Sequence, residues 1–171
     1  MQHVEEVGRV LRSLRGIWDE EAVDELDHAL QSAARARDDG ADDELVLAAA
    51  LHDLAHSPLF HGPHAEHHDL FAREWLSPRF GERVGWLAGA HVAAKRYLAA
   101  TDPGYALSDT SAVSLRHQGG PGVDAEFVDH PWFSDALRLR RYDDAAKDPY
   151  ADGMTIDDVL AVAERVARHA I

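Results

Sequence analysis

The chain has 171 residues, no cysteine and a formal net charge of −14. Its length suits one domain with its own core, and without cysteine any metal must be held by histidine and carboxylate, which excludes disulfides and Cys-type zinc sites. The acidic balance argues against a nucleic-acid partner, and the lack of a long uncharged apolar stretch predicts no membrane span or secretory leader, so we expect a soluble cytoplasmic protein.

Apolar residues recur at three- and four-residue spacing along almost the whole chain, which predicts an all-α fold. The first helix is expected at about 19–37, ending at the Asp-Asp-Gly sequence of 38–40. A second helix opens with three acids at 42–44, which favour the positive end of the helix dipole, and runs through LVLAAALHDLAH to Ser57 and Pro58. Because this segment is apolar nearly all round, it should lie at the centre of the fold.

The middle of the chain is predicted to contain one short helix and one long helix. After a loop at 59–66, the short helix is expected at about 67–76. Ser77 and Pro78 then suit the N-cap and the first residue of a long helix that reaches about Ala100.

Shorter helices are predicted in the last third of the chain, with a Gly- and Pro-rich loop at 118–122. Thr155 and Asp158 approximate a capping box at the start of the last helix, to which we assign no chemistry. The chain should form a single domain, a bundle of about six to eight helices with a catalytic core at about 18–150 and a structural C-terminal helix. The helices of this part are expected at about 110–117, 125–129, 133–147 and 155–170.

His52 and Asp53 carry the strongest chemical signal. They lie in the apolar run AAALHDLAH, where burial of an ionised carboxylate is unfavourable unless a partner neutralises it. A bound cation is such a partner, and neighbours on a helix differ by about 100° in direction, so both residues can bind one metal centre. His56 lies one turn further on the same face and is a candidate substrate contact. The alternative is a core histidine with a local hydrogen bond.

His91 and Lys95 lie one turn apart on the same face of the predicted long helix. His91 falls on the apolar stripe and should point inward, where a hydrogen-bonded core histidine is the ordinary alternative to a metal ligand. Burial of a lysine beside it is explained if an anion binds there. Together the two residues suggest a metal ligand followed by an anion-binding cation.

Two further candidates carry weaker signals. In LRLRRYDDAAK, the residues Arg140, Asp143 and Lys147 fall on one helix face, which fits either a functional site or a solvated surface with internal ion pairs. His28 lies opposite the apolar residues of its predicted helix and shares a face with Glu21.

The order of these histidines and acids resembles the HD-domain superfamily of metal-dependent phosphohydrolases. Across about 18–150 the chain is similar to one branch of it, the di-iron oxygenases of phosphonate breakdown. HVAAKRYL, the Gln-Gly-Gly-Pro turn and RRYDDAAK are specific to this branch, whereas a bare His-Asp pair is not. The segments that carry the resemblance are, in order, DHALQSA, ALHDLAH, HHDLFAREWL, HVAAKRYL, SAVSLRHQGGP and LRLRRYDDAAK.

The resemblance implies a cofactor of two iron ions, one ferrous and one ferric, with O2 as co-substrate. It implies six metal ligands, of which the acid of the His-Asp pair bridges the two ions: His28, His52, Asp53, His68, His91 and Asp143. His68 fits the family's His-acid pattern better than three neighbouring histidines, which we expect in an exposed loop: His61, His64 and His67. Asp144 is the alternative to Asp143 as a ligand.

The resemblance also places the phosphonate group of a small anionic substrate against a lysine, two serines and an arginine: Lys95, Ser111, Ser114 and Arg140. His56 would lie near the carbon to be oxidised, so His56 and Lys95 are the expected catalytic residues. Lysine offers a point charge, and arginine offers a planar fork that matches phosphonate oxygens.

The segment ahead of the first histidine departs from the family's pattern. Where the family carries a tyrosine and a glutamate, this chain has Trp18 and Glu21, which we assign as lid or specificity residues. Because tryptophan cannot ligate iron, gating of an iron ion by tyrosine is lost here or achieved differently. As a hypothesis, Trp18 and Glu21 receive an ammonium group by cation–π attraction and ion pairing.

The reaction that the resemblance implies is oxidative cleavage of the C–P bond of a 1-hydroxyphosphonate, giving phosphate and a carboxylic acid. The alternative is a phosphohydrolase in which two divalent ions activate water for attack on a small phosphate ester or nucleotide, since the same six residues would serve. A non-enzymatic helical binding module is a third interpretation, but it would leave Asp53 buried without a metal.

Overall fold

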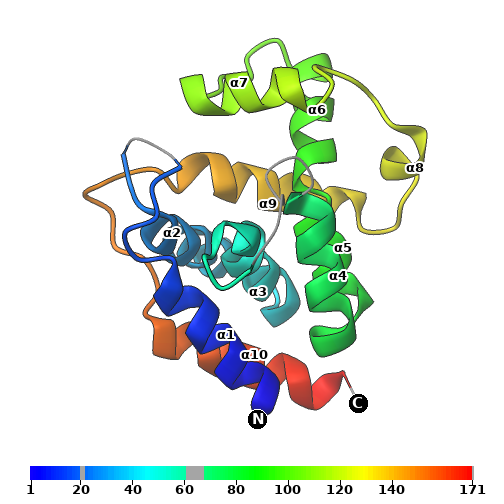
Figure 1. Ribbon diagram of the computed structural model, residues 1–171. Helices are drawn as coiled ribbons and strands as arrows, with labels where there is room; N and C mark the ends of the chain where they lie inside the picture. The colour runs from blue at the N-terminus through cyan, green and yellow to red at the C-terminus, as the bar shows by residue number, and fades with distance from the viewer. Residues whose placement is uncertain (20–21, 61–67, 171) are drawn as a thin grey trace.

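The computed structural model describes residues 1–19, 22–60 and 68–170, and in these ranges the chain is helical without strands (Figure 1). The prediction of a single all-α domain is confirmed, with ten α-helices in the described ranges where about six to eight were expected. They are α1 (Gln2–Ser13), α2 (Glu25–Asp38), α3 (Asp43–Leu51), α4 (His68–Phe80), α5 (Glu82–Gly89), α6 (His91–Thr101), α7 (Asp109–His117), α8 (Ala125–Val128), α9 (Phe133–Ala145) and α10 (Ile156–His169).

Side-chain caps fix where several of these helices begin. The Asp24 carboxylate accepts a hydrogen bond of 2.9 Å from the backbone N–H of Asp27, so α2 begins at Glu25, later than predicted. The expected capping box at the start of α10 is present, with Thr155 and Asp158 each bonding the other's backbone N–H. Short polar side chains therefore set these boundaries more firmly than the apolar pattern does.

Helix α3 is central and buried, as predicted. Every residue at 45–51 is buried, and the helix packs against α2, α5, α9 and α10. It ends earlier than predicted, however, and a 3-10 turn follows it, so His52 and Asp53 come after the helix instead of lying within it. Pro58 closes the helical region because it holds Ser57 in an extended conformation.

The predicted helix start at Ser77 and Pro78 is wrong, since both residues lie inside α4. The actual break comes at Gly81, whose φ of 101° is readily adopted only by glycine, between α4 and α5. The predicted long helix is also divided, at Ala90, where the backbone N–H bonds two successive carbonyls and tightens the turn. This second break makes His91 the first residue of α6.

The remaining helices enclose α3 and extend away from it. Helix α1, for which no separate prediction was made, packs against α2 and α10, while α9 contacts α2, α3, α5 and α6. Figure 1 shows that α7 and the C-terminal part of α6 lie apart from α1, α3 and α10. None of the helices in the described ranges is long and apolar enough to cross a membrane.

Candidate metal centre

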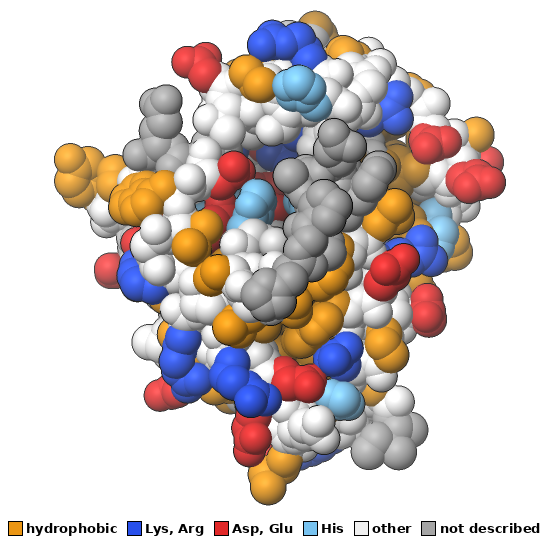
Figure 2. Space-filling model, viewed as in Figure 1, with side chains coloured by type: hydrophobic (Ala, Val, Ile, Leu, Met, Phe, Trp, Pro, Cys, Tyr) orange, Lys and Arg blue, Asp and Glu red, His pale blue; other side chains and the backbone are white. Residues whose placement is uncertain are grey.

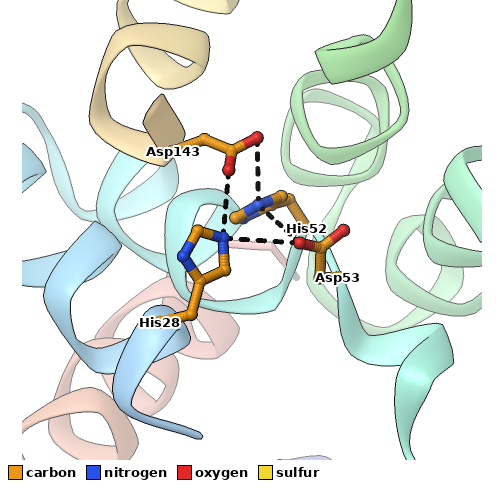
Figure 3. A group of neighbouring side chains, drawn as sticks. All are labelled: His28, His52, Asp53 and Asp143. Carbon is orange, nitrogen blue, oxygen red and sulfur yellow. Dashed lines mark ion pairs between the residues drawn. The ribbon is translucent and has the colours of Figure 1, made fainter. Parts of the chain in front are cut away.

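Four of the predicted metal ligands meet at one point in the core: His28 of α2, His52 and Asp53 after α3, and Asp143 of α9 (Figure 3). One ligand atom from each lies within 4.8 Å of those of the others. Nε2 of His28 is 3.0 Å from Asp143 Oδ1 and 3.4 Å from Asp53 Oδ2. Nε2 of His52 is 3.1 Å from Asp53 Oδ2 and 3.3 Å from Asp143 Oδ2. Two imidazoles and two carboxylates thus face one another around a common centre.

Main-chain carbonyl groups orient the histidines of this centre. In three of them Nδ1 donates to a backbone carbonyl, so in the neutral ring Nε2 carries a lone pair that points into the centre. Nε2 of His52 is buried and has no hydrogen-bond partner among the described residues. The Nδ1–oxygen distances are 2.8 Å for His28 to Ala146, 2.7 Å for His52 to Ala49 and 2.6 Å for His91 to Ala88.

The electrostatics of the centre require positive charge. Burial alone would lower the pKa of His28, but its hydrogen bonds to Asp143 and Asp53 outweigh burial and raise that pKa to about 10. Burial likewise opposes ionisation of the two acids, yet His52 lowers the pKa of Asp53 and Arg140 lowers the pKa of Asp143, both well below their ordinary value. The carboxylates are therefore ionised, and either protons on the imidazoles or a metal cation must balance them.

Asp53 also faces a second pair of histidines with its other oxygen. His68 at the start of α4 and His91 at the start of α6 each place Nε2 at 3.6 Å from Asp53 Oδ1, and their two Nε2 atoms are 3.0 Å apart. Burial lowers the pKa of His91 to about 3, so this ring is neutral and offers a lone pair. Asp53 therefore lies between two sets of nitrogen donors, an arrangement that suits two neighbouring cations.

The two successive acids of α9 have different partners. Asp143 faces the histidines and also accepts from Arg140, whose Nη1 lies 2.6 Å from Asp143 Oδ2. Asp144 instead pairs with the other side of the Arg140 guanidinium and accepts from the hydroxyl of Tyr105. Arg140 is thus held between both acids, and of the two only Asp143 belongs to the described cluster of possible ligands.

Two of the proteins similar to this chain are named as dioxygenases. The hydroxymethylphosphonate dioxygenase of Gimesia maris is 36% identical over an alignment of 154 residues, and the match covers 82% of this chain and 74% of the relative. The 1-hydroxy-2-(trimethylamino)ethylphosphonate dioxygenase of Leisingera caerulea, a glycine-betaine-forming enzyme, is 33% identical over an alignment of 160 residues, and the match covers 82% of this chain and 81% of that protein. The chain belongs to the HD-domain phosphonate dioxygenases.

This membership confirms the resemblance predicted from the sequence segments. An uncharacterised protein of Acanthamoeba polyphaga mimivirus is also similar, at 32% identity over an alignment of 140 residues, and the match covers 74% of this chain and 64% of that protein. No protein-family model matches the chain. Because the two relatives with a named activity are dioxygenases, the comparison favours the oxygenase over the phosphohydrolase alternative.

The residues predicted to hold the phosphonate of an HD-domain dioxygenase are only partly gathered. Lys95 of α6 is 4% exposed, and burial together with the nearby charge of Arg140 lowers its pKa to about 8. Ser111 is buried, and its hydroxyl lies 3.1 Å from Nζ of Lys147. Ser114, by contrast, donates to a backbone carbonyl of its own helix at 3.1 Å. Lys147, which the helix-face argument named without assigning it a role, thus lies beside Ser111.

The lid residues predicted for this dioxygenase are described only in part. Trp18 is 63% exposed, and Glu21 lies outside the described residues. The three histidines expected in an exposed loop also lie outside them: His61, His64 and His67. His56, predicted to contact substrate, is in place beside the centre, with Nε2 at 3.9 Å from Asp53 Oδ1.

Sequence reasoning missed Glu25. This residue is 2% exposed, and its Oε2 is buried without a hydrogen-bond partner among the described residues. Burial and the charge of Asp53 raise the pKa of the Glu25 carboxyl to about 7. In the sequence it is one acid among several near a helix start, where acids are common for the helix dipole alone, so no local signal distinguishes it.

Proposed function

We propose that this protein is a di-iron oxygenase that cleaves the C–P bond of a small 1-hydroxyphosphonate with O2, giving phosphate and a carboxylic acid. The observation that carries the proposal is the position of Asp53 between two sets of histidine nitrogens in a chain of the phosphonate dioxygenase family. The reaction balances without another reductant: a hydroxyphosphonate and one O2 contain the atoms of one carboxylic acid and one phosphate.

The donor set fits iron. The six residues proposed as ligands supply four imidazole nitrogens and two carboxylates, and non-haem iron oxygenases use histidine and carboxylate with exchangeable positions left open. When bound as a ferrous and ferric pair, iron would supply activation of O2. The six proposed ligands are His28, His52, Asp53, His68, His91 and Asp143.

The cationic side of the site is proposed to hold the phosphonate. Lys95 is buried on this side of the site, and the charges of Arg140 and Lys147 both act to lower its pKa. Three cations close together repel one another, and a dianionic phosphonate relieves that repulsion. The Ser111 hydroxyl, whose oxygen accepts from Lys147, would donate to the same anion, and His56 would flank the carbon to be oxidised.

The test is an aerobic assay of the iron-loaded protein with a panel of 1-hydroxyphosphonates, recording O2 uptake and phosphate release together. One phosphate per O2 is the expected result. The same protein loaded with zinc is the control, because zinc has no redox chemistry and should release no phosphate. Phosphate release without O2 uptake, or equal release with zinc, would instead identify a hydrolase.

A further inference from the structure

Arg140 of α9 has carboxylate partners on two sides of its guanidinium group. Nη1 lies 2.6 Å from Oδ2 of Asp143, one of the proposed metal ligands. Nε donates to Oδ1 of Asp144 at 3.1 Å, and Nη2 pairs with the same oxygen. Because the Arg140 side chain is only 3% exposed, these contacts fix the direction of the guanidinium inside the protein.

The hydroxyl group of Tyr105 completes the contacts on the Nε side. It donates to Oδ2 of Asp144 and accepts from Nε of Arg140 at 3.2 Å. Burial raises the pKa of Tyr105, so the hydroxyl stays protonated and can donate. Tyr105, Asp144 and Arg140 therefore form a closed ring of hydrogen bonds, in which each side chain contacts the other two.

The sequence places Tyr105 in a turn between the two helices that carry Lys95 and Ser111. In Asp-Pro-Gly-Tyr, the backbone N–H of Gly104 donates to Oδ1 of Asp102 at 3.0 Å, and that of Tyr105 donates to the Asp102 carbonyl at 3.0 Å. The turn follows the end of α6 and precedes α7. The hydroxyl contacts of Tyr105 thus join the α6–α7 connection to α9.

This arrangement leaves donors of Arg140 for an anion. A guanidinium has five N–H groups, of which Nε carries one and each terminal nitrogen carries two. Nη1 faces Asp143 and Nη2 faces Asp144, so each has a second N–H that can donate to a phosphonate oxygen. The proposed metal centre is partly exposed at Asp53 and His56, and Figure 2 shows acidic and histidine side chains in a hollow of the molecular surface.

We infer that Tyr105 and Asp144 are positioning residues, which hold Arg140 so that its terminal nitrogens serve Asp143 and the phosphonate at once. The inference rests on the proposed function, in which Arg140 contacts the phosphonate. Without the Tyr105 hydroxyl, Nε of Arg140 and the carboxylate of Asp144 each lose one partner. The guanidinium is then free to turn, and its planar fork no longer meets the oxygens of the anion in one fixed direction.

The experiment measures binding of methylphosphonate, a probe with the anionic group alone, to the metal-loaded protein without O2. Tyr105→Phe is the informative variant because it removes one hydroxyl and changes no charge, whereas removal of the Asp144 charge would itself favour an anion. It should raise the calorimetric Kd about fivefold or more, the size of one lost hydrogen bond to a charged group. Its metal content should equal that of the wild type.

Tyr142→Phe is the matched control. The Tyr142 hydroxyl also donates to a carboxylate, that of the exposed Asp39, so both variants lose the same group and the same kind of bond. Urea denaturation should show similar losses of stability, but only Tyr105→Phe should weaken methylphosphonate binding. An unchanged Kd in Tyr105→Phe, or equal weakening in both variants, would overturn the inference. Absence of methylphosphonate binding to the wild type would overturn it too, since Arg140 would then hold no anion.

Arg140→Lys tests whether Tyr105 acts through Arg140. Lysine keeps the charge but has no Nε donor and no planar fork. In this background Tyr105→Phe should change Kd by less than about twofold, because the interaction through which it acts is already absent. The same loss in both backgrounds would show a merely structural role and contradict the inference. If Arg140→Lys binds no metal, the comparison of Tyr105→Phe with Tyr142→Phe decides alone.

Turnover separates this inference from the proposed function. With a 1-hydroxyphosphonate in air, Tyr105→Phe should raise KM by a larger factor than it lowers kcat. If Tyr105→Phe weakens methylphosphonate binding but the iron-loaded wild type releases no phosphate from any hydroxyphosphonate, the positioning role stands and the proposed reaction fails. If the wild type consumes O2 and releases phosphate while Kd and KM are unchanged in Tyr105→Phe, the positioning role fails and the reaction stands.

Discussion

Asp53 differs from the other proposed ligands because its two carboxylate oxygens face different pairs of histidines. Oδ2 lies toward His28 and His52, whereas Oδ1 lies toward His68 and His91. A change at Asp53 should therefore disturb both proposed cation positions at once. A change at a residue on one side should disturb one position and leave the other occupied.

The neighbouring acids of α9 provide a matched pair for testing this. Asp143→Asn is expected to weaken binding of one metal ion by at least about 100-fold, because it removes a carboxylate that faces His28 and His52. Asp144→Asn should keep both ions, since Asp144 binds Arg140 and Tyr105 instead. Metal content after dialysis, measured by mass spectrometry, decides between them, and loss of metal in Asp144→Asn alone would reverse the assignment.

Metal affinity is expected to rise with pH. In the metal-free protein the pKa of His28 is raised to about 10, so the ring is protonated at neutral pH, but a metal ligand must be unprotonated. Binding must therefore expel a proton, and affinity should increase by about tenfold per pH unit for each proton expelled. Calorimetry in buffers of different ionisation enthalpy measures the protons released. An affinity that is constant from pH 6 to pH 8 would contradict this picture.

At the scale of helices, the contact between α4 and α5 explains why the predicted boundary at Ser77 was wrong. Gly85 of α5 approaches α4 so closely that an added Cβ would lie 2.0 Å from Ser77 Oγ and 2.9 Å from the Arg73 carbonyl oxygen. Ser77 is thus a small residue at a tight helix crossing, with its hydroxyl buried there. Nothing in the local sequence distinguishes that role from the N-cap role that serine also favours.

The same contact predicts the effect of a single methyl group. Gly85→Ala should destabilise the protein by about 1–3 kcal/mol, because the new Cβ overlaps backbone atoms that cannot move without separating the helices. Gly104→Ala is the control, since its Cβ would meet only Asp102 Oδ1 at 3.5 Å. Urea denaturation gives both free energies of unfolding. Equal values for the two variants would show that α4 and α5 can part without cost.

For the molecule as a whole, the sequence predicts which segments are buried better than it predicts where the helices are interrupted. The apolar run of α3 predicts a central helix, and the cost of burying a carboxylate in the apolar sequence around Asp53 predicts a cation nearby, from physical principles alone. His28 and His68 are brought to the centre by the packing of distant helices, which only the family resemblance anticipated. The break at Ala90 directly follows Gly89, the last residue of α5, but a lone glycine inside an apolar helical pattern is a weak signal, so the sequence predicts one continuous helix there.

Metal binding is expected to slow amide hydrogen exchange at three separate helix ends. The carbonyl groups that orient the histidines belong to residues at or near the ends of α3, α5 and α9, far apart in the sequence: Ala49, Ala88 and Ala146. Iron that holds the rings should suppress fraying of those ends, so amide hydrogen exchange should slow there together, while α1 is unaffected. Exchange that slows uniformly over all helices would indicate general stabilisation instead.

Because His52 and His91 each follow the helix whose carbonyl holds the ring, the direction of each ring depends on the number of residues in that helix. One inserted or deleted residue in α3 or α5 would rotate the following histidine by about 100° about the helix axis and turn its lone pair away from its partners. Length variation in this protein is therefore expected to be tolerated between helices and excluded within those two. Grafting or redesign of the centre should preserve helix length before it preserves surface composition.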